Sequence, residues 1–235
     1  MLRPCELGTS RGSEANSTLP APGELREVSA SLETMPAGAA VAWAHEKFGE
    51  RLVLASSFQD CVLIDIVTKA VRTIEVVFLD TGFHFPETLV YVEQVTERYG
   101  LNLTVMRPRV HPQQWPCGSV RCCEVRKVEP MARALEGRLA WMSGVRRVDA
   151  ETRWDVPIVG FDRTRGVVKV NPLAAWTDAD VARYVDDHQL PRHPLMTQGY
   201  PSIGCAPTTD PVEPGLHPRS GRWRGTEKTE CGLHI

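Results

Sequence analysis

The stretch RLVLASSFQDCVLIDIVTK, residues 51–69, combines a short apolar run, a polar turn and a longer apolar run. The first run, residues 51–56, is rich in strand-forming residues and predicts a buried strand. The second run predicts a helix that continues to about Lys69, with Cys61 packed in the core. A strand that leads straight into a helix is typical of a parallel βαβ unit.

The same alternation of strand and helix continues along the chain. Pro86 opens the next predicted helix, because proline fits the first helical turn. Repeated units of this kind predict an α/β fold with a mostly parallel sheet and helices on both faces. The further strands are expected at 74–80, 101–107 and 139–145, and the further helices at 86–99 and 123–136.

The pattern changes after Gly144. Two apolar runs flank the turn DRTRG (162–166) and predict a hairpin, and residues 177–188 predict a helix with Thr177 as its N-cap. We divide the chain into a flexible arm rich in Gly, Ser and Pro, a nucleotide-binding domain and a mobile C-terminal tail. The three parts cover residues 1–36, 37–215 and 216–235.

Composition excludes several classes of function. The chain has 235 residues, 42% hydrophobic and 24% charged, as is typical of a soluble globular protein. A net charge of −2 gives no field that would recruit nucleic acid or an anionic membrane. The apolar runs are too short to span a bilayer, and the first residues lack the apolar core of a secretory signal, so we expect a cytoplasmic protein. The seven cysteines, an odd number, favour metal ligands or catalytic thiols over a disulfide scaffold.

Polar or glycine-bearing segments follow three of the predicted strands. They are SSFQD with Ser56 and Ser57, LDTG with Asp80, Thr81 and Gly82, and SGVRR with Arg146. Ligands of open α/β sheets bind beyond the carboxyl ends of the strands, so these segments predict a nucleotide-phosphate site. The helix that follows SSFQD could hold an anion at its N-terminus, although serines at such a place are usually helix caps.

Eight motifs then carry a family resemblance. In chain order they are SSFQDCVLID, FLDTGFHFPET, CCEVRKVEP, SGVRRVDAETR, KVNPLAAWTDADV, GYPSIGCAPT, PRSGRW and KTECGLH. Together and in this order they resemble the assimilatory sulfonucleotide reductases, and within them the adenylyl-sulfate (APS) reductases that use thioredoxin. The resemblance covers about residues 40–235 and implies an adenine nucleotide alpha-hydrolase-like sheet.

The resemblance implies a chemistry for the C-terminal tail. Cys231, in KTECGLH, would attack the sulfate sulfur of APS, so that AMP leaves and S-sulfocysteine remains on the enzyme. Thioredoxin would then reduce this adduct and release sulfite, as a step of sulfate assimilation toward cysteine. The residues agree with this role, because the thiolate is the attacking form and Lys228 and His234 flank the cysteine.

Basic side chains are candidates for binding the substrate. Arg146, Arg219 and Arg222 have guanidinium groups that suit the oxygens of phosphate and sulfate, and Arg147 is a further candidate for the same clamp. The alternative is that they are solvated surface charge, which is the interpretation we favour for Arg224. Two more candidates, Lys127 and His234, have the alternatives of an exposed helix lysine and a plain tail residue.

The family pattern also implies a four-iron four-sulfur (4Fe-4S) cluster, and here the sequence departs from it. Cys122, Cys123 and Cys205 match three of its ligands, but Thr208 stands where the fourth cysteine is expected. A hydroxyl is a harder and less acidic ligand than a thiol. Three outcomes are open: a cluster with three thiolates and a loosely held fourth iron, replacement of the missing ligand by Cys117, or loss of the cluster.

Other functions remain to be compared with this one. A reductase of the 3′-phosphorylated substrate PAPS would need extra basic contacts near the ribose, and the Cys122–Cys123 pair argues against it. A non-catalytic relative that binds nucleotide or thioredoxin is disfavoured by the intact KTECGLH. An ATP pyrophosphatase usually shows a Ser-Gly-Gly loop, which SSFQD lacks.

Overall fold

The computed structural model describes residues 19–111, 113–224, 228 and 230–233. Their centre is a six-stranded sheet with the strand order β3-β2-β1-β4-β6-β5. Neighbouring strands are parallel, except for the antiparallel pair β5 and β6. The mostly parallel sheet and the hairpin after Gly144 are therefore confirmed. The strands are β1 (Leu52–Ser56), β2 (Glu75–Leu79), β3 (Asn102–Met106), β4 (Ala140–Ser143), β5 (Val159–Asp162) and β6 (Val167–Val170).

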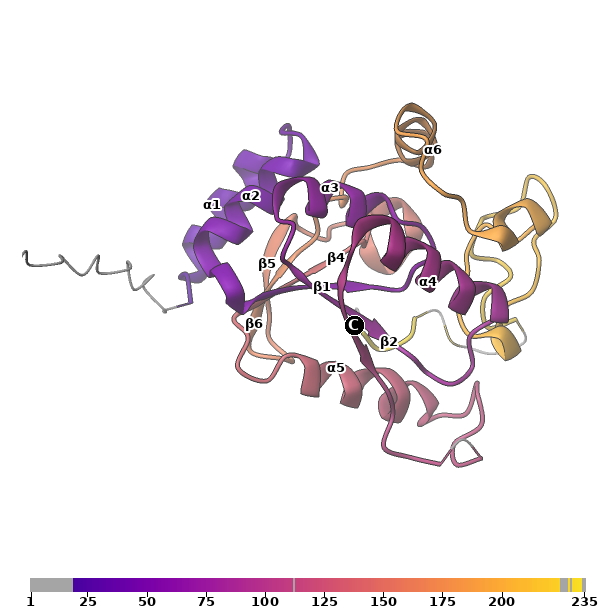
Figure 1. The fold of residues 1–235 in the computed structure, drawn as a ribbon. Helices are drawn as coiled ribbons and strands as arrows, with labels where there is room; N and C mark the ends of the chain where they lie inside the picture. Colours follow the sequence, from indigo (N-terminus) through magenta and orange to yellow (C-terminus); the bar gives the residue numbers. More distant parts are fainter. Residues whose placement is uncertain (1–18, 112, 225–227, 229, 234–235) are drawn as a thin grey trace, which may run out of the picture.

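Helices cover both faces of the sheet, as predicted (Figure 1). Helices α1 to α4 lie on the face that is uppermost in Figure 1, and α5 lies on the opposite face. The α-helices are α1 (Pro22–Leu32), α2 (Ala37–Phe48), α3 (Val62–Ala70), α4 (Pro86–Tyr99), α5 (Glu129–Ala134) and α6 (Asp178–Asp187). A π-helix, η2 (Glu124–Val128), runs directly into α5, and 3-10 turns span Gly49–Arg51, Arg147–Asp149, Glu151–Arg153, Pro194–Gln198 and Ala206–Thr208.

Alternation along the strands gives the protein two cores. In β1, Leu52 and Leu54 pack into the core beneath α2 and α3, whereas Val53 packs into the core beneath α5. Trp141 of β4 joins Val53 on the α5 side. Successive side chains of a strand point to opposite faces, so a strand covered on both sides is apolar at every position. This is why residues 52–55 of the predicted strand appear in the sequence as an unbroken apolar run.

The helix ends follow local sequence signals. Asp180 N donates to Thr177 Oγ1 at 3.2 Å and Thr177 N donates to the Asp180 carboxylate at 2.9 Å, a capping box that starts α6 as predicted. Pro86 occupies the first turn of α4, and that helix stops at Gly100, which has φ +59°.

The N-terminal segment differs from its prediction. Residues 22–32 form α1, where the sequence predicted part of a flexible arm over residues 1–36. Leu25 and Leu32 of this helix are buried, and the Ser29 hydroxyl accepts a hydrogen bond from Val159 N of β5. The Gly, Ser and Pro content of the whole segment hid the short amphipathic repeat that packs α1 on the sheet. Residues 1–18 of the predicted arm lie outside the described part of the chain.

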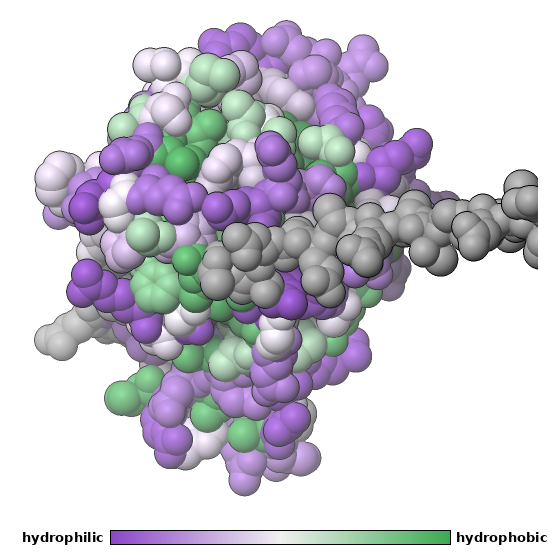
Figure 2. Space-filling view, turned by 90° about the vertical axis from the view of Figure 1, so that its left-hand side faces the viewer, coloured by the Kyte–Doolittle hydropathy of each residue, from purple (hydrophilic) through white to green (hydrophobic). Residues whose placement is uncertain are grey.

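The surface over α1 and α2 is mainly hydrophilic, with small apolar areas between polar side chains (Figure 2). Of the helices in the part of the chain that the structure describes, none has the length and apolarity needed to cross a membrane.

The strand order fixes where a ligand can enter. From β1 the chain runs outward through β2 and β3; β4 lies on the other side of β1, and from it the chain goes to the edge strand β5 and returns to β6. The connections that leave β1 and β4 therefore go to opposite directions, which opens a crevice at the carboxyl ends of these two strands. Ala55 and Ser143 are paired in register at this point.

Candidate active site

A cavity of about 510 Å³ lies at the carboxyl ends of β1 and β4. This volume is in the range of small-molecule sites. Most of the polar candidates from the sequence lie in its wall. The predicted residues that line it are Ser56, Ser57, Lys127, Arg146, Arg219, Arg222 and Cys231.

The loop between β1 and α3 forms one wall of the cavity. Phe58, at its centre, is fully buried with φ +54° and packs edge-on against Phe78 at 5.4 Å between ring centroids. The Ser56 hydroxyl accepts a hydrogen bond from Phe58 N at 3.1 Å, and Asp60 accepts one from Val62 N at 3.0 Å. Burial raises the pKa of Asp60, although the Val62 hydrogen bond opposes this shift. Ser56 thus stabilises the shape of the loop, whereas Ser57 remains exposed at the cavity.

Arg146 leaves one donor for a ligand. Its guanidinium bonds Asp149 at 2.7 Å and Asp178 at 2.8 Å, and the carboxylates outweigh burial and raise the pKa of the arginine. Its second terminal nitrogen, NH1, is buried and has no hydrogen-bond partner among the described residues. A buried donor without a partner is costly, so this nitrogen marks a place where a ligand oxygen would be stabilised.

Arg222 is held flat between its neighbours. Its guanidinium lies 4.5 Å from the ring centroid of Trp223 and bonds the Ser202 hydroxyl at 3.3 Å. A Cβ on Gly204 would come within 2.9 Å of Arg222 Nε, so only glycine leaves room for this guanidinium. The Arg222 Nε atom is buried and, within the described chain, unbonded, which makes it a second donor available to an anionic ligand.

Part of the described C-terminal tail lines the cavity, including Arg219, Glu230 and Cys231. Cys231 is partly exposed there, and the preceding Glu230 is buried. Arg153 donates to both carboxylate oxygens of Glu230 at 2.6 Å, and Thr152 and Arg219 add bonds at 3.2 and 3.4 Å. The structure thus shows a docked position of the tail, while its predicted mobility is not tested by this one conformation.

Lys127 connects the cavity with a second, smaller pocket. The lysine, together with Arg222 and Trp223, lines both. Burial lowers the pKa of Lys127, but the neighbouring thiols, Cys231 first and then Cys205, outweigh burial and raise it. A charged lysine is therefore shared between the predicted nucleophile and the predicted cluster cysteines.

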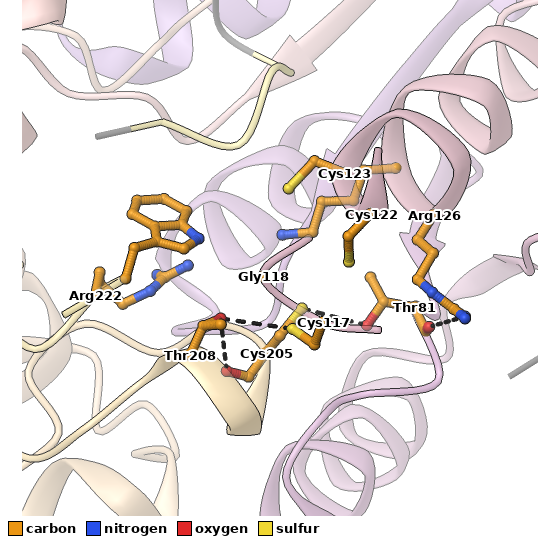
Figure 3. Close-up of a pocket in the computed structure, with 11 residues that line it drawn as sticks. Thr81, Cys117, Gly118, Cys122, Cys123, Arg126, Cys205, Thr208 and Arg222 are labelled. Carbon is orange, nitrogen blue, oxygen red and sulfur yellow. Dashed lines mark hydrogen bonds between the residues drawn. The ribbon is translucent and has the colours of Figure 1, made fainter. Parts of the chain in front are cut away.

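Four cysteines line this smaller pocket (Figure 3). The predicted ligands Cys122 and Cys123 come from the start of the π-helix region, and Cys205 comes from an isolated bridge with His84. Cys117 joins them in the lining, and its sulfur lies 3.6 Å from the Thr208 hydroxyl. The nearby Cys117 thiol lowers the pKa of Cys122 and lowers that of Cys205 to about 5, while the pKa of Cys117 is raised.

This donor set fits an iron–sulfur cluster. Four thiols are the usual ligands of such a cluster, and each binds a different iron. The four cysteine sulfur atoms therefore surround the cluster and do not meet at a single ion. Among the described residues, no group of three or more His, Cys, Asp or Glu side chains is arranged to hold a metal ion. Lys127 and Arg222 bring positive charge to the same pocket, and Lys228 Nζ lies 3.9 Å from Cys123 Sγ.

Three predicted substrate residues lie elsewhere. Asp80, Thr81 and Gly82 follow β2 and are not in the wall of the large cavity. Asp80 pairs with Arg107 at 3.0 Å and caps Gly82 N, and Thr81 lies in the cysteine pocket, 3.5 Å from Cys205 Sγ. The reason is topological, since β2 is one strand removed from the crevice between β1 and β4.

Two further basic residues do not reach the cavity. Arg147, a further candidate for the anion clamp, does not line the cavity: its guanidinium pairs with Glu33 of α1 and lowers the pKa of that carboxyl. Arg224 is exposed, as expected of surface charge. His234 lies outside the described residues.

Sequence reasoning missed two groups that shape the cavity. Arg153 and Glu230 both stand in the quoted motifs SGVRRVDAETR and KTECGLH, but an ion pair across 77 residues leaves no signal in a single sequence. The other group is His193, whose ring nitrogens bond Thr88 and Leu195 N. A lone histidine in the Pro- and Gly-rich region after residue 190 gave no pattern to interpret.

Comparison with known proteins agrees with the family resemblance of the sequence motifs. Residues 51–211 match the phosphoadenosine phosphosulfate reductase domain. The chain is 41% identical to the adenosine 5'-phosphosulfate reductase of Rhodococcus opacus (strain B4), over 90% of this chain and 95% of the relative. It is 43% identical to the adenosine 5'-phosphosulfate reductase of Mycolicibacterium smegmatis, with the same shares covered.

Solved structures agree on the fold. The phosphoadenylyl-sulfate (PAPS) reductase of Candida auris, solved as a phosphate complex, matches with a TM-score of 0.73 and 25% identity over 83% of this chain and all of that chain. The FMN adenylyltransferase of Candida glabrata matches with a TM-score of 0.59 at 16% identity over 81% of this chain and 72% of that chain, which is a likeness of fold alone. The adenine nucleotide alpha-hydrolase-like architecture is therefore confirmed. The chain belongs to the phosphoadenosine phosphosulfate reductase domain family and, within it, to the oxidoreductases that are named adenosine 5'-phosphosulfate reductases.

Proposed function

We propose that this protein reduces adenosine 5'-phosphosulfate to sulfite and AMP with electrons from thioredoxin. The observation that carries the proposal is the position of Cys231, which lies in one cavity with Arg146, Arg219, Arg222 and Lys127 at the carboxyl ends of β1 and β4. A thiol among cationic groups can meet an anionic substrate there, and the curated relatives bear the name of this activity.

In the first step, the Cys231 thiolate attacks the sulfate sulfur. A sulfur–sulfur bond forms, the bond from sulfur to the phosphate-bridging oxygen breaks, and AMP leaves with that electron pair. The unbonded Nε of Arg222 and NH1 of Arg146 are donors that suit the oxygens of the sulfate and phosphate groups. Lys127 adds charge beside the thiol.

In the second step, a thioredoxin thiolate attacks the Cys231 sulfur of the adduct. The sulfur–sulfur bond of S-sulfocysteine breaks, and sulfite leaves with the electron pair. The second thioredoxin thiol then displaces Cys231 from the mixed disulfide, which leaves oxidised thioredoxin and the free Cys231 thiol. This step needs Cys231 to be reachable by a protein, so the tail has to leave its docked position at Glu230.

A four-iron four-sulfur cluster on the cysteine pocket would supply an anionic body that orients the nearby cations. Lys127 lies in the walls of both pockets and is the side chain through which such an effect would reach the substrate. The described cysteines are all free thiols, which supports a reducing compartment such as the cytoplasm. A role in sulfate assimilation is supported by the names of the curated relatives.

The test is a Cys231→Ser variant, with Cys61→Ser as the control for loss of a cysteine outside both pockets. Incubated with APS in the absence of thioredoxin, the wild type and Cys61→Ser are expected to gain the mass of one SO₃ group on the Cys231 peptide. Cys231→Ser is expected to bind AMP, to gain no such mass and to release no sulfite when thioredoxin is added. Sulfite release by the serine variant at the wild-type rate would overturn the proposal.

A further inference from the structure

The Thr208 side chain makes contacts within the protein on both its hydroxyl and its methyl group. Its hydroxyl bonds the carbonyl oxygen of Cys205 at 3.4 Å and lies 3.6 Å from the Cys117 sulfur. Its methyl group packs at Gly118, where an added Cβ would lie 3.3 Å away. The threonine therefore fills space beside a thiol that comes from a different segment of the chain, as Figure 3 shows.

The segment that carries this thiol is sharply bent. Trp115 has φ +57° and Gly118 has φ +89°, so two residues on either side of Cys117 adopt the left-handed conformation. A non-glycine residue in this region is strained and persists only where the surroundings hold it. The bend turns Cys117 toward Thr208 and Cys205.

Arg126 holds the bend in place. This arginine is 2% exposed, and its guanidinium donates to the carbonyl oxygens of Gln114 at 2.7 Å, His111 at 3.3 Å and Trp115 at 3.4 Å. A fourth bond, at 3.1 Å, goes to the carbonyl oxygen of Thr81 beside Cys205. One buried side chain thus ties the loop of Cys117 to the strand end next to the other cysteines.

The result is a set of four thiols, because Cys117 lines the same pocket as Cys122, Cys123 and Cys205. Its sulfur lies 3.6 Å from the Thr208 hydroxyl, and Thr208 occupies the position where the fourth cysteine is expected. Thiolate is a soft ligand and is the ligand type that iron–sulfur clusters use, whereas a threonine hydroxyl is hard and hardly acidic. Wherever the cluster forms in this pocket, the chemistry favours the sulfur of Cys117 over the oxygen of Thr208.

We propose that Cys117 is the fourth ligand of an iron–sulfur cluster held with Cys122, Cys123 and Cys205, and that Thr208 does not bind iron. Each of the four thiols loses a proton to solvent as its sulfur bonds one iron, and no electron is transferred in this ligation. The inference rests on the cluster named in the proposed function. It adds that Cys117, five residues before the Cys122–Cys123 pair, replaces the cysteine that is missing at position 208.

The test compares iron and acid-labile sulfide in proteins purified without oxygen and reconstituted with iron and sulfide. The variants are Cys117→Ser, Thr208→Ala, the double variant Cys117→Ser with Thr208→Cys, and Cys61→Ser as a control thiol that lines neither pocket. We expect wild type, Thr208→Ala and Cys61→Ser to hold the same iron, and Cys117→Ser to lose most of it. The double variant should regain iron, because it returns a thiol to the same corner of the pocket.

Thermal unfolding of the metal-free proteins separates ligand loss from loss of fold. Equal melting temperatures for wild type and Cys117→Ser show that the fold is intact. Arg126→Lys is a second variant, which loosens the loop of Cys117 but keeps all four thiols. Full iron in Cys117→Ser would overturn the inference, and so would wild-type protein that holds no iron after reconstitution. Neither result depends on sulfite release, so a failure here is distinct from a failure of the proposed reaction.

Discussion

Arg153 holds the carboxylate of Glu230 with two hydrogen bonds of 2.6 Å, and the next residue along the chain is Cys231. Both side chains are buried, with 7% and 3% of their surface exposed. Burial raises the pKa of Glu230, but the bonds and charge of Arg153 outweigh it and lower the pKa, so the carboxylate is charged at neutral pH. This ion pair fixes the place of the predicted nucleophile in the cavity.

Glu230→Gln is expected to release the tail more than to unfold the protein. The neutral amide loses the charge-assisted bonds, while Arg153 keeps a bond to Asp149 at 3.3 Å. We expect alkylation of Cys231 to become about tenfold faster, which corresponds to about 1.4 kcal/mol of docking free energy. Peptide mapping after iodoacetamide treatment measures the rate. The exposed Glu213→Gln variant is the control, and equal labelling of Cys231 in both would contradict the anchor role.

Arg222→Ala is expected to lower kcat/KM for APS without a comparable fall in the stability of the protein. The variant removes the guanidinium that Gly204 and Trp223 hold at the boundary of both pockets. Bonds of a charged donor contribute about 1.5–3 kcal/mol, so kcat/KM for APS should fall by about ten- to a hundredfold. Steady-state kinetics measure this. Arg224→Ala removes an exposed arginine of the same segment and should leave kcat/KM unchanged, so equal effects of the two variants would count against a substrate contact.

APS is expected to be preferred over its 3′-phosphorylated form. The additional phosphate needs basic contacts of its own, and three arginines of the cavity, Arg146, Arg153 and Arg219, are already paired with carboxylates. A preference of about tenfold in kcat/KM corresponds to about 1.4 kcal/mol. Competition of the two nucleotides at equal concentration gives this ratio directly. A higher kcat/KM for PAPS would reverse the assignment of substrate.

His193 is expected to make the protein less stable in weak acid. Its Nδ1 accepts a hydrogen bond from Leu195 N at 3.2 Å and its Nε2 lies 3.0 Å from the Thr88 hydroxyl, so the ring is held neutral. Burial lowers its pKa from 6.5 to about 4. Because the folded pKa is below the unfolded one, the unfolded state binds more protons as the pH falls from about 7 to 4, and folding loses stability over this window.

The size of this effect follows from the same shift in pKa. Between pH 7 and pH 5 the free energy of unfolding should fall by about 2 kcal/mol more in the wild type than in His193→Gln, which has no group to titrate at this position. Urea unfolding at the two pH values gives the difference for each protein. Parallel pH dependence in the two proteins would show that His193 is protonated equally in both states.

Much of this protein was predictable because its signals are local. The apolar run at 51–56, Pro86 and the Thr177 cap each act within a few residues, and all three elements appear where the sequence places them. Helix α1 was missed, since a weakly amphipathic segment is stabilised by packing on β5 and not by its own composition. The motifs also predicted Ser56, Ser57, Arg146 and Cys231, which the fold does bring to one cavity.

The sequence by itself determined the fold class, the family and the identity of the thiol at position 231. Tertiary structure alone decided that Asp80 turns away from the cavity, that Glu230 is clamped by Arg153, and that Cys117 stands beside Thr208. These three relationships join residues that are 27, 77 and 91 positions apart. The order of the strands and the bend of a loop bring such residues together. Neither the strand order nor the bend can be read from the residues that adjoin them in the sequence.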